Sequence, residues 1–144
     1  MTPREEEPMN TLHSAILVGL GGAVGTIIRY LVSAAIPHAA GLDFGTLLVN
    51  LSGAFVLGWL TSVLVVRGAD AGRSARTRLF VGTGVLGGYT TYSTLAIGSL
   101  DAIAAGSVAA GIAYALGSVV LGIACAAAGI LLGRRPRAAA GEQR

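Results

Sequence analysis

Charged side chains are scarce in this chain. They make up 12% of its 144 residues, and lysine is absent, so all ten basic residues are arginine. Soluble domains carry about 25% charged residues. Hydrophobic residues reach 53% and the mean hydropathy is +0.73, which is more apolar surface than so short a chain can bury as a soluble globule. The same composition excludes intrinsic disorder, and the few basic residues argue against a nucleic-acid binder. A small integral membrane protein remains.

Cysteine and proline are also sparse. Cys125 is the single cysteine, which excludes an intrachain disulfide and a CxxC metal site. Pro37 follows the first apolar run, and the other three prolines lie in the tails, so no proline is expected to kink a helix. No group of His, Cys or carboxylate residues has the spacing of a metal site or a catalytic triad.

Four apolar stretches are each long enough to cross a bilayer core, which takes about 20 helical residues. They cover about residues 14–36, 46–66, 79–100 and 108–133. None alternates apolar and polar residues as the strands of a membrane barrel do. We therefore predict an all-α integral membrane protein with a four-helix domain over residues 14–133. An N-terminal tail (1–13), whose acidic residues argue against a cleaved signal peptide, precedes it, and a basic tail (134–144) follows.

The arginines gather on one predicted side of the membrane. Nine of them lie in the two tails and the second connection: Arg4, Arg67, Arg73, Arg76, Arg78, Arg134, Arg135, Arg137 and Arg144. The first and third connections, about residues 37–45 and 101–107, contain none. Basic loops stay in the cytoplasm, so both termini are predicted there. Arg29 is the only charge within a span. It either reaches the interface or faces inward and attracts anions by its positive potential.

Small and polar residues occur inside the predicted spans. GxxxG pairs such as Gly21–Gly25 and Gly84–Gly88 favour close helix packing in lipid. Asn50 is a lone amide in the second span. It has two interpretations, an interhelical hydrogen bond or a pore-lining donor, because its NH₂ group offers two donors without a charge.

The third span contains the segment Gly87-Gly88-Tyr89-Thr90-Thr91-Tyr92-Ser93-Thr94-Leu95. A glycine pair followed by hydroxyl-bearing residues predicts a helix break near mid-span. Membranes tolerate the exposed carbonyls and amides of a break only where they are buried in protein or line a cavity. Free carbonyls there can hold a cation such as Na⁺, and the hydroxyls of Ser93 and Thr94 would line a polar track. The alternative is an unbroken helix with a hydroxyl-rich packing seam.

Together these segments resemble the FluC (CrcB) family of bacterial fluoride channels over about residues 14–133. The first span contributes Gly21 to Gly25 followed by Arg29-Tyr30, the second contributes Gly45 to Gly53, and the third contributes Gly84 to Leu95. The resemblance implies an antiparallel dimer of four-helix subunits in the bacterial cell membrane. It also implies two pores through which fluoride leaves the cytoplasm passively, which lowers its toxicity.

The resemblance assigns roles to individual residues. A structural Na⁺, which is not transported, would lie at the dimer centre on the main-chain carbonyls of Gly87 and Thr90. Hydrogen-bond donors and the positive edges of aromatic rings would replace the water around fluoride. The fluoride path would include Asn50, Tyr92, Ser93, Thr94, Leu95 and Tyr114.

Two features depart from the family pattern. The family has a phenylalanine pair where this chain has Tyr92 and Leu95, and leucine offers no ring edge, so at least one pore is expected to be altered if two copies pair. The one-sided arginines predict a single fixed orientation, whereas an antiparallel homodimer needs both. The two features together suggest one half of a heterodimer whose partner is a related subunit of opposite orientation.

Two further functions remain open. A non-conducting accessory subunit of a heterodimeric channel is compatible with Leu95. A small multidrug exporter needs a membrane-embedded carboxylate, but Asp43, Asp70 and Asp101 all fall in predicted connections. An enzyme is not expected.

Overall fold

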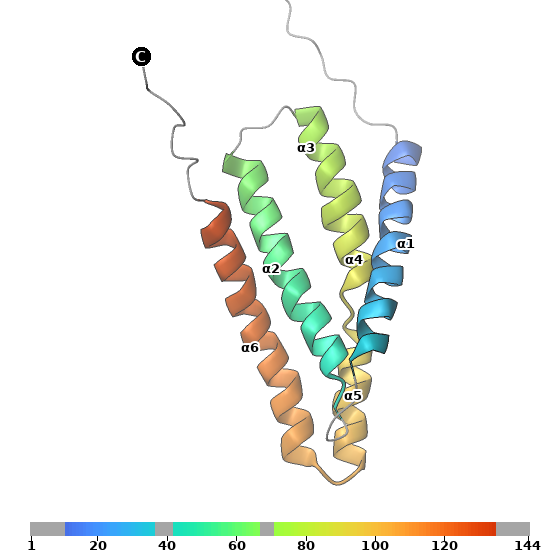
Figure 1. The fold of residues 1–144 in the computed structure, drawn as a ribbon, viewed down its shortest axis with the longest axis vertical. Coiled ribbons are helices and arrows are strands. Elements are labelled where there is room, and N and C mark those ends of the chain that lie inside the picture. The colour runs from blue at the N-terminus through green and yellow to red at the C-terminus, as the bar shows by residue number, and fades with distance from the viewer. Residues whose placement is uncertain (1–10, 37–41, 67–70, 135–144) are drawn as a thin grey trace, which may run out of the picture.

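The computed structural model describes residues 11–36, 42–66 and 71–134, and every regular element in these ranges is a helix. Figure 1 shows three long helices beside a column of shorter ones stacked end to end. The elements are α1 (Thr11–Ala35), α2 (Phe44–Val66), α3 (Ala71–Thr77), the π-helix η1 (Arg78–Val85), α4 (Leu86–Tyr89), α5 (Ser93–Ala104) and α6 (Val108–Gly133). Most of the predicted tails and part of the first two connections lie outside the described residues.

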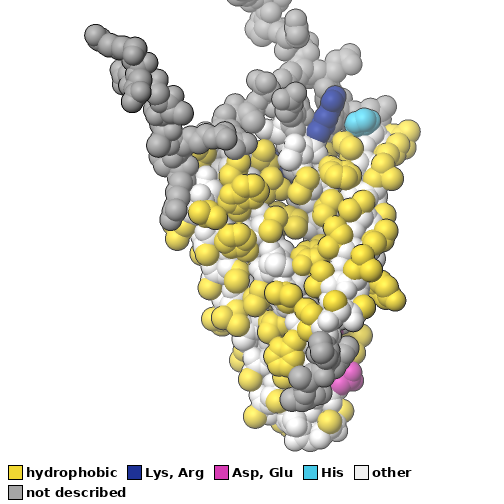
Figure 2. All heavy atoms as spheres, in the orientation of Figure 1, with side chains coloured by type: hydrophobic (Ala, Val, Ile, Leu, Met, Phe, Trp, Pro, Cys, Tyr) yellow, Lys and Arg dark blue, Asp and Glu magenta, His cyan; other side chains and the backbone are white. Residues whose placement is uncertain are grey.

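The long helices are the predicted first, second and fourth spans. α1, α2 and α6 are each long and apolar enough to cross a membrane. Their large apolar side chains point outward in many places, for example Leu116 and Ile123 on α6, and Figure 2 shows hydrophobic side chains along most of the visible face. Few large side chains are fully buried, with Val49 the main one. A surface of this kind is suited to lipid rather than to water.

The third predicted span differs from the expectation of residues 79–100. Its helical column begins at Ala71 and ends at Ala104, with a break between Tyr89 and Ser93. Residues 71–78 are therefore helical and not part of a loop, and Asp101 lies in α5 and not in the third connection. The prediction was wrong at both ends because it ended the helix at charged residues. Arginine is a good helix former, and charges at a helix end stay in water.

Glycine residues let the backbone of α1 pack directly against the backbones of η1 and α4. A Cβ on Gly25 would overlap the Val85 carbonyl oxygen, and one on Gly88 would overlap the Gly22 carbonyl oxygen. α2 and α6 meet in the same way, since a Cβ on Gly129 would overlap the Phe55 carbonyl oxygen. The close packing predicted from the GxxxG pairs is confirmed at these contacts.

Apart from Arg29, which lies within α1, charged side chains occupy opposite ends of the described bundle. Arg76, Arg78 and Arg134 belong to the end formed by α3 and the last turns of α2 and α6, whereas Asp43 and Asp101 belong to the other end (Figure 1). On the visible face, Figure 2 shows a basic side chain at one end and an acidic one at the other. The bundle therefore has a basic end and an acidic end, separated by its apolar sides.

We predict that Gly25→Ala destabilises the protein, because the new methyl group meets backbone atoms of Val85 and Tyr89 that cannot move aside cheaply. The expected loss is about 1–3 kcal/mol, typical of overpacking. Gly19→Ala on the same helix is the matched control, since its Cβ meets nothing within 4 Å. Thermal unfolding in detergent measures both variants, and equal midpoints would contradict the close contact.

Candidate functional site

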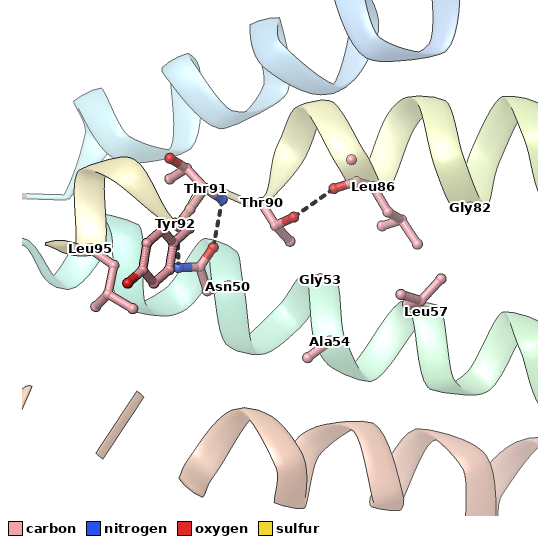
Figure 3. Close-up of a pocket in the computed structure, with 11 residues that line it drawn as sticks. Asn50, Gly53, Ala54, Leu57, Gly82, Leu86, Thr90, Thr91, Tyr92 and Leu95 are labelled. Atoms are coloured by element: carbon pink, nitrogen blue, oxygen red, sulfur yellow. Dashed lines mark hydrogen bonds between the residues drawn. The ribbon is translucent and has the colours of Figure 1, made fainter. Parts of the chain in front are cut away.

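The break in the helical column is held by Asn50 of α2. Its Nδ2 donates to the Thr91 carbonyl at 2.8 Å, and the Thr91 N–H donates to Asn50 Oδ1 at 2.8 Å (Figure 3). In a continuous α-helix the Thr91 N–H would instead bond to the carbonyl of Gly87. Thr90 is extended, with ψ 156°. The side-chain amide of Asn50 thus takes both main-chain hydrogen bonds of one residue, Thr91, where the helix stops.

Hydroxyl groups complete both helix ends at the break. Thr91 Oγ1 accepts the Thr94 N–H at 3.3 Å, as an N-cap side chain does, and lies 3.2 Å from both Ser93 Oγ and Thr94 Oγ1. On the other side, the Thr90 hydroxyl donates to the Leu86 carbonyl at 2.9 Å. The run of hydroxyl residues therefore ends one helix and begins the next.

The glycine pair does not itself form the break. Gly87 and Gly88 remain helical in α4, and the break follows at Thr90 and Thr91. Gly88 packs against Gly22, while Gly87 is exposed with open space where its side chain would be. The predicted break is confirmed, but its predicted cause was incomplete, because a hydrogen-bonding partner on another helix fixes its position.

A cavity of about 400 Å³ lies beside the break, between α2 and the column. Its polar residues, Asn50, Thr90 and Thr91, lie at the break, and Figure 3 shows Leu57 and Gly82 toward its other end. The lining residues are Asn50, Gly53, Ala54, Leu57, Gly82, Leu86, Gly87, Thr90, Thr91, Tyr92 and Leu95. Of the two hydrogens on Asn50 Nδ2, one is committed to Thr91, so the amide retains a second donor.

Five of the predicted site residues meet at this cavity: Asn50, Gly87, Thr90, Tyr92 and Leu95. Tyr92 is 82% exposed and Leu95 is 8% exposed, so the tyrosine stands at the rim while the leucine is an inner wall. Ser93 and Thr94 are not among the lining residues, but their hydroxyls each lie 3.2 Å from the hydroxyl of Thr91, which is one of them.

Two predicted residues lie away from the cavity. Tyr114 is buried and donates its hydroxyl to the Asp43 carbonyl at 2.6 Å, near the acidic end. Arg29 is half-buried, one turn beyond Gly25 on α1, and forms no ion pair with a carboxylate of the described residues. Within this one chain neither side chain lines the space at the break.

Thr91 is a residue of the site that was not predicted from the sequence. It is 8% exposed and bonds to Asn50 through its main chain, and its hydroxyl caps α5. The polar run around it gave the signal for a break, but no local pattern distinguishes Thr91 from Thr90 or Thr94. Only its pairing with a residue 41 positions earlier does so.

The fold and the site together define a multi-pass helical membrane protein with a broken helix at a partly polar cavity. Residues 16–130 match the family model described as CrcB-like protein, Camphor Resistance (CrcB). The chain belongs to this family.

Individual relatives of the chain are similar to it over most of its length. The chain is 49% identical over 116 residues, 79% of each protein, to fluoride-specific ion channel FluC 2 of Leifsonia xyli subsp. xyli. It is 48% identical over 99 residues to FluC 1 of Cutibacterium acnes, covering 68% of this chain and 69% of the relative. It is 39% identical over 105 residues to FluC of Rhizobium meliloti, covering 72% and 82%. These relatives are named as ion channels and not as enzymes.

We predict that Asn50→Ala destabilises the break and speeds hydrogen exchange at the Thr91 amide. The substitution leaves the buried Thr91 N–H and carbonyl without their partner, at about 1–3 kcal/mol for each unsatisfied group. Cys125→Ala, far from the break, is the control and should leave both properties unchanged. Exchange measured by mass spectrometry reports the effect, and unchanged protection at Thr91 would refute the assigned role of Asn50.

Proposed function

We propose that this chain is a subunit of a passive fluoride-selective channel that lets fluoride leave the cytoplasm and so lowers its toxicity. The observation that carries the proposal is the pair of hydrogen bonds between Asn50 and Thr91. They hold a break in the helical column beside a cavity with largely apolar walls. Membership of the CrcB-like family and relatives named as fluoride-specific channels support it. In this proposal the α3–α5 column is the third of four membrane spans.

The cavity suits a small anion because it offers donors without a carboxylate. Fluoride gives up its water only where hydrogen-bond donors and positive ring edges replace it. The second N–H of Asn50, the hydroxyls of Ser93 and Thr94 and the ring of Tyr92 supply them. Arg29 adds positive potential from α1. Tyr114 contributes by holding the start of α2 through the Asp43 carbonyl.

A structural Na⁺ at Gly87 and Thr90 is part of the proposal. The Gly87 carbonyl loses its helical donor because the Thr91 N–H bonds to Asn50, and Gly87 and Thr90 both line the cavity. Main-chain carbonyls at a helix break are suitable ligands for Na⁺. Two carbonyls leave such an ion under-coordinated, so a second subunit in an antiparallel dimer would supply the others. When bound, Na⁺ would supply a fixed positive charge and would not be transported.

The partner in that dimer is proposed to be a related subunit of opposite orientation. The basic and acidic ends of the described bundle and the nine one-sided arginines support a fixed insertion, with the basic end in the cytoplasm of a bacterial cell. Leu95 supports a partner that differs from this chain, because it places an aliphatic side chain where the family has a ring.

A non-conducting accessory subunit is the second candidate. Leu95 favours it, since this side chain is 8% exposed and occupies the cavity wall without offering a donor or a ring edge. A multidrug exporter is disfavoured, because α1, α2 and α6 contain no carboxylate for proton coupling, and Asp101 lies in the last turn of α5 at the acidic end.

Fluoride efflux from proteoliposomes tests the channel. We expect passive efflux in Na⁺ medium, a large loss on Tyr92→Ala, and no change on Cys125→Ala, which lies outside the cavity. Protein purified and reconstituted with a bulky organic cation in place of Na⁺ should conduct less and dissociate more readily. Efflux that appears only with a related partner chain would identify an accessory or heterodimeric subunit. No efflux in either preparation would refute the channel.

Topology reporters on the two termini test the orientation. Expressed without a partner, the chain should place both termini in the cytoplasm in nearly all molecules, because the arginine distribution favours that insertion. Replacing the four arginines of residues 134–144 with glutamine, as a comparison, should weaken the preference. Substantial insertion of the native chain in both orientations would refute the fixed orientation and with it the heterodimer.

A further inference from the structure

A second cavity lies between α2 and the helical column, at the basic end of the bundle. Its volume is about 300 Å³, and its lining residues are Thr61, Leu64, Val65, Ser74, Ala75 and Arg78. α2 forms one wall and α3 with the first residue of η1 forms the other. The first cavity lies between the same two parts of the fold, nearer the break.

The two cavities follow one another along these helices. On α2, Leu57 lines the first cavity and Thr61, four residues later, lines the second. On η1, Gly82 lines the first cavity and Arg78, four residues earlier, lines the second. A Cβ on Gly82 would lie 3.8 Å from Arg78 Cγ and 3.9 Å from Leu57 Cδ1, so glycine leaves open space at this junction. About one helical turn therefore separates the residues that line the two spaces.

The chemistry of the second cavity suits an anion. Arg78 is exposed at its lip, and the described residues form no ion pair that neutralises it. The Ser74 hydroxyl is buried and has no hydrogen-bond partner among the described residues, whereas the Thr61 hydroxyl already donates to the Leu57 carbonyl. One permanent positive charge thus stands at the lip of a space walled largely by apolar side chains, which weaken screening, and a buried hydroxyl without a partner lies in its wall.

We propose that this cavity is a vestibule in which Arg78 concentrates small monovalent anions before they reach the cavity at the break. The proposal rests on the proposed channel function and adds a site that acts on the rate of anion capture. A positive charge at the mouth of a low-dielectric groove raises the local anion concentration, and added salt screens that effect.

The test compares Arg78→Gln with Arg76→Gln in planar bilayers of zwitterionic lipid, using the full chain in the assembly that conducts. Arg76 is also exposed at the basic end but does not line the cavity. At low fluoride and about 0.01 M ionic strength, Arg78→Gln should lower conductance roughly two- to fivefold relative to Arg76→Gln. At about 1 M the difference should vanish, because the screening length falls to about 3 Å. Arg78→Lys keeps the charge and should conduct nearly as the native chain does.

The outcomes separate this inference from the proposed function. A native chain that never conducts refutes the channel itself. If the native chain conducts while both glutamine variants match it at low ionic strength, the vestibule is refuted. An effect of Arg78→Gln that appears only with anionic lipids would assign the site to a lipid phosphate and also refute it. The salt series on the native chain needs no variant: low-fluoride conductance that does not fall with added inert salt refutes the vestibule.

Discussion

The reciprocal pair of hydrogen bonds between Asn50 and Thr91 is the interaction on which the rest of the site depends. A helix at membrane depth can be interrupted only if the freed backbone groups find partners inside the protein. The Asn50 amide carries an N–H donor and an oxygen acceptor on the same side, so it pairs with both main-chain groups of Thr91. It thereby frees the carbonyl of Gly87 and allows the Thr91 hydroxyl to begin α5.

The cavity exists because close packing elsewhere leaves one looser seam. Glycines bring α1 to backbone distance from η1 and α4, and others bring α2 to backbone distance from α6. These two tight layers meet between α2 and the column. Near the break they are joined by the Ser52 and Tyr89 hydroxyls, 2.9 Å apart, and by the packing of Gly53 against Thr90. Within each layer the helix backbones are already in contact and cannot move closer without overlap. The space between α2 and the column is therefore a consequence of the two tight layers.

The sequence predicted the parts of this structure that depend on local pattern. Hydropathy located α6 at its observed bounds and α1 and α2 to within three residues, because lipid imposes a continuous apolar length. The hydroxyl run predicted a break. Its position, and the role of Thr91, depend on Asn50, which is distant in sequence and near only in the fold. The column begins at Ala71, earlier than the predicted span. The difference arises because arginine indicates the boundary of the membrane and not the boundary of a helix.

The separation of charge along the bundle bears on how such a subunit pairs. Arg76, Arg78 and Arg134 at one end and Asp43 and Asp101 at the other give the described chain a net polarity along its length. Two copies side by side in one orientation would place like charges together at both ends. A related partner in the opposite orientation would place its basic end beside Asp43 and Asp101. In the proposed antiparallel pair, the charges at each end would therefore attract rather than repel, most strongly at low ionic strength.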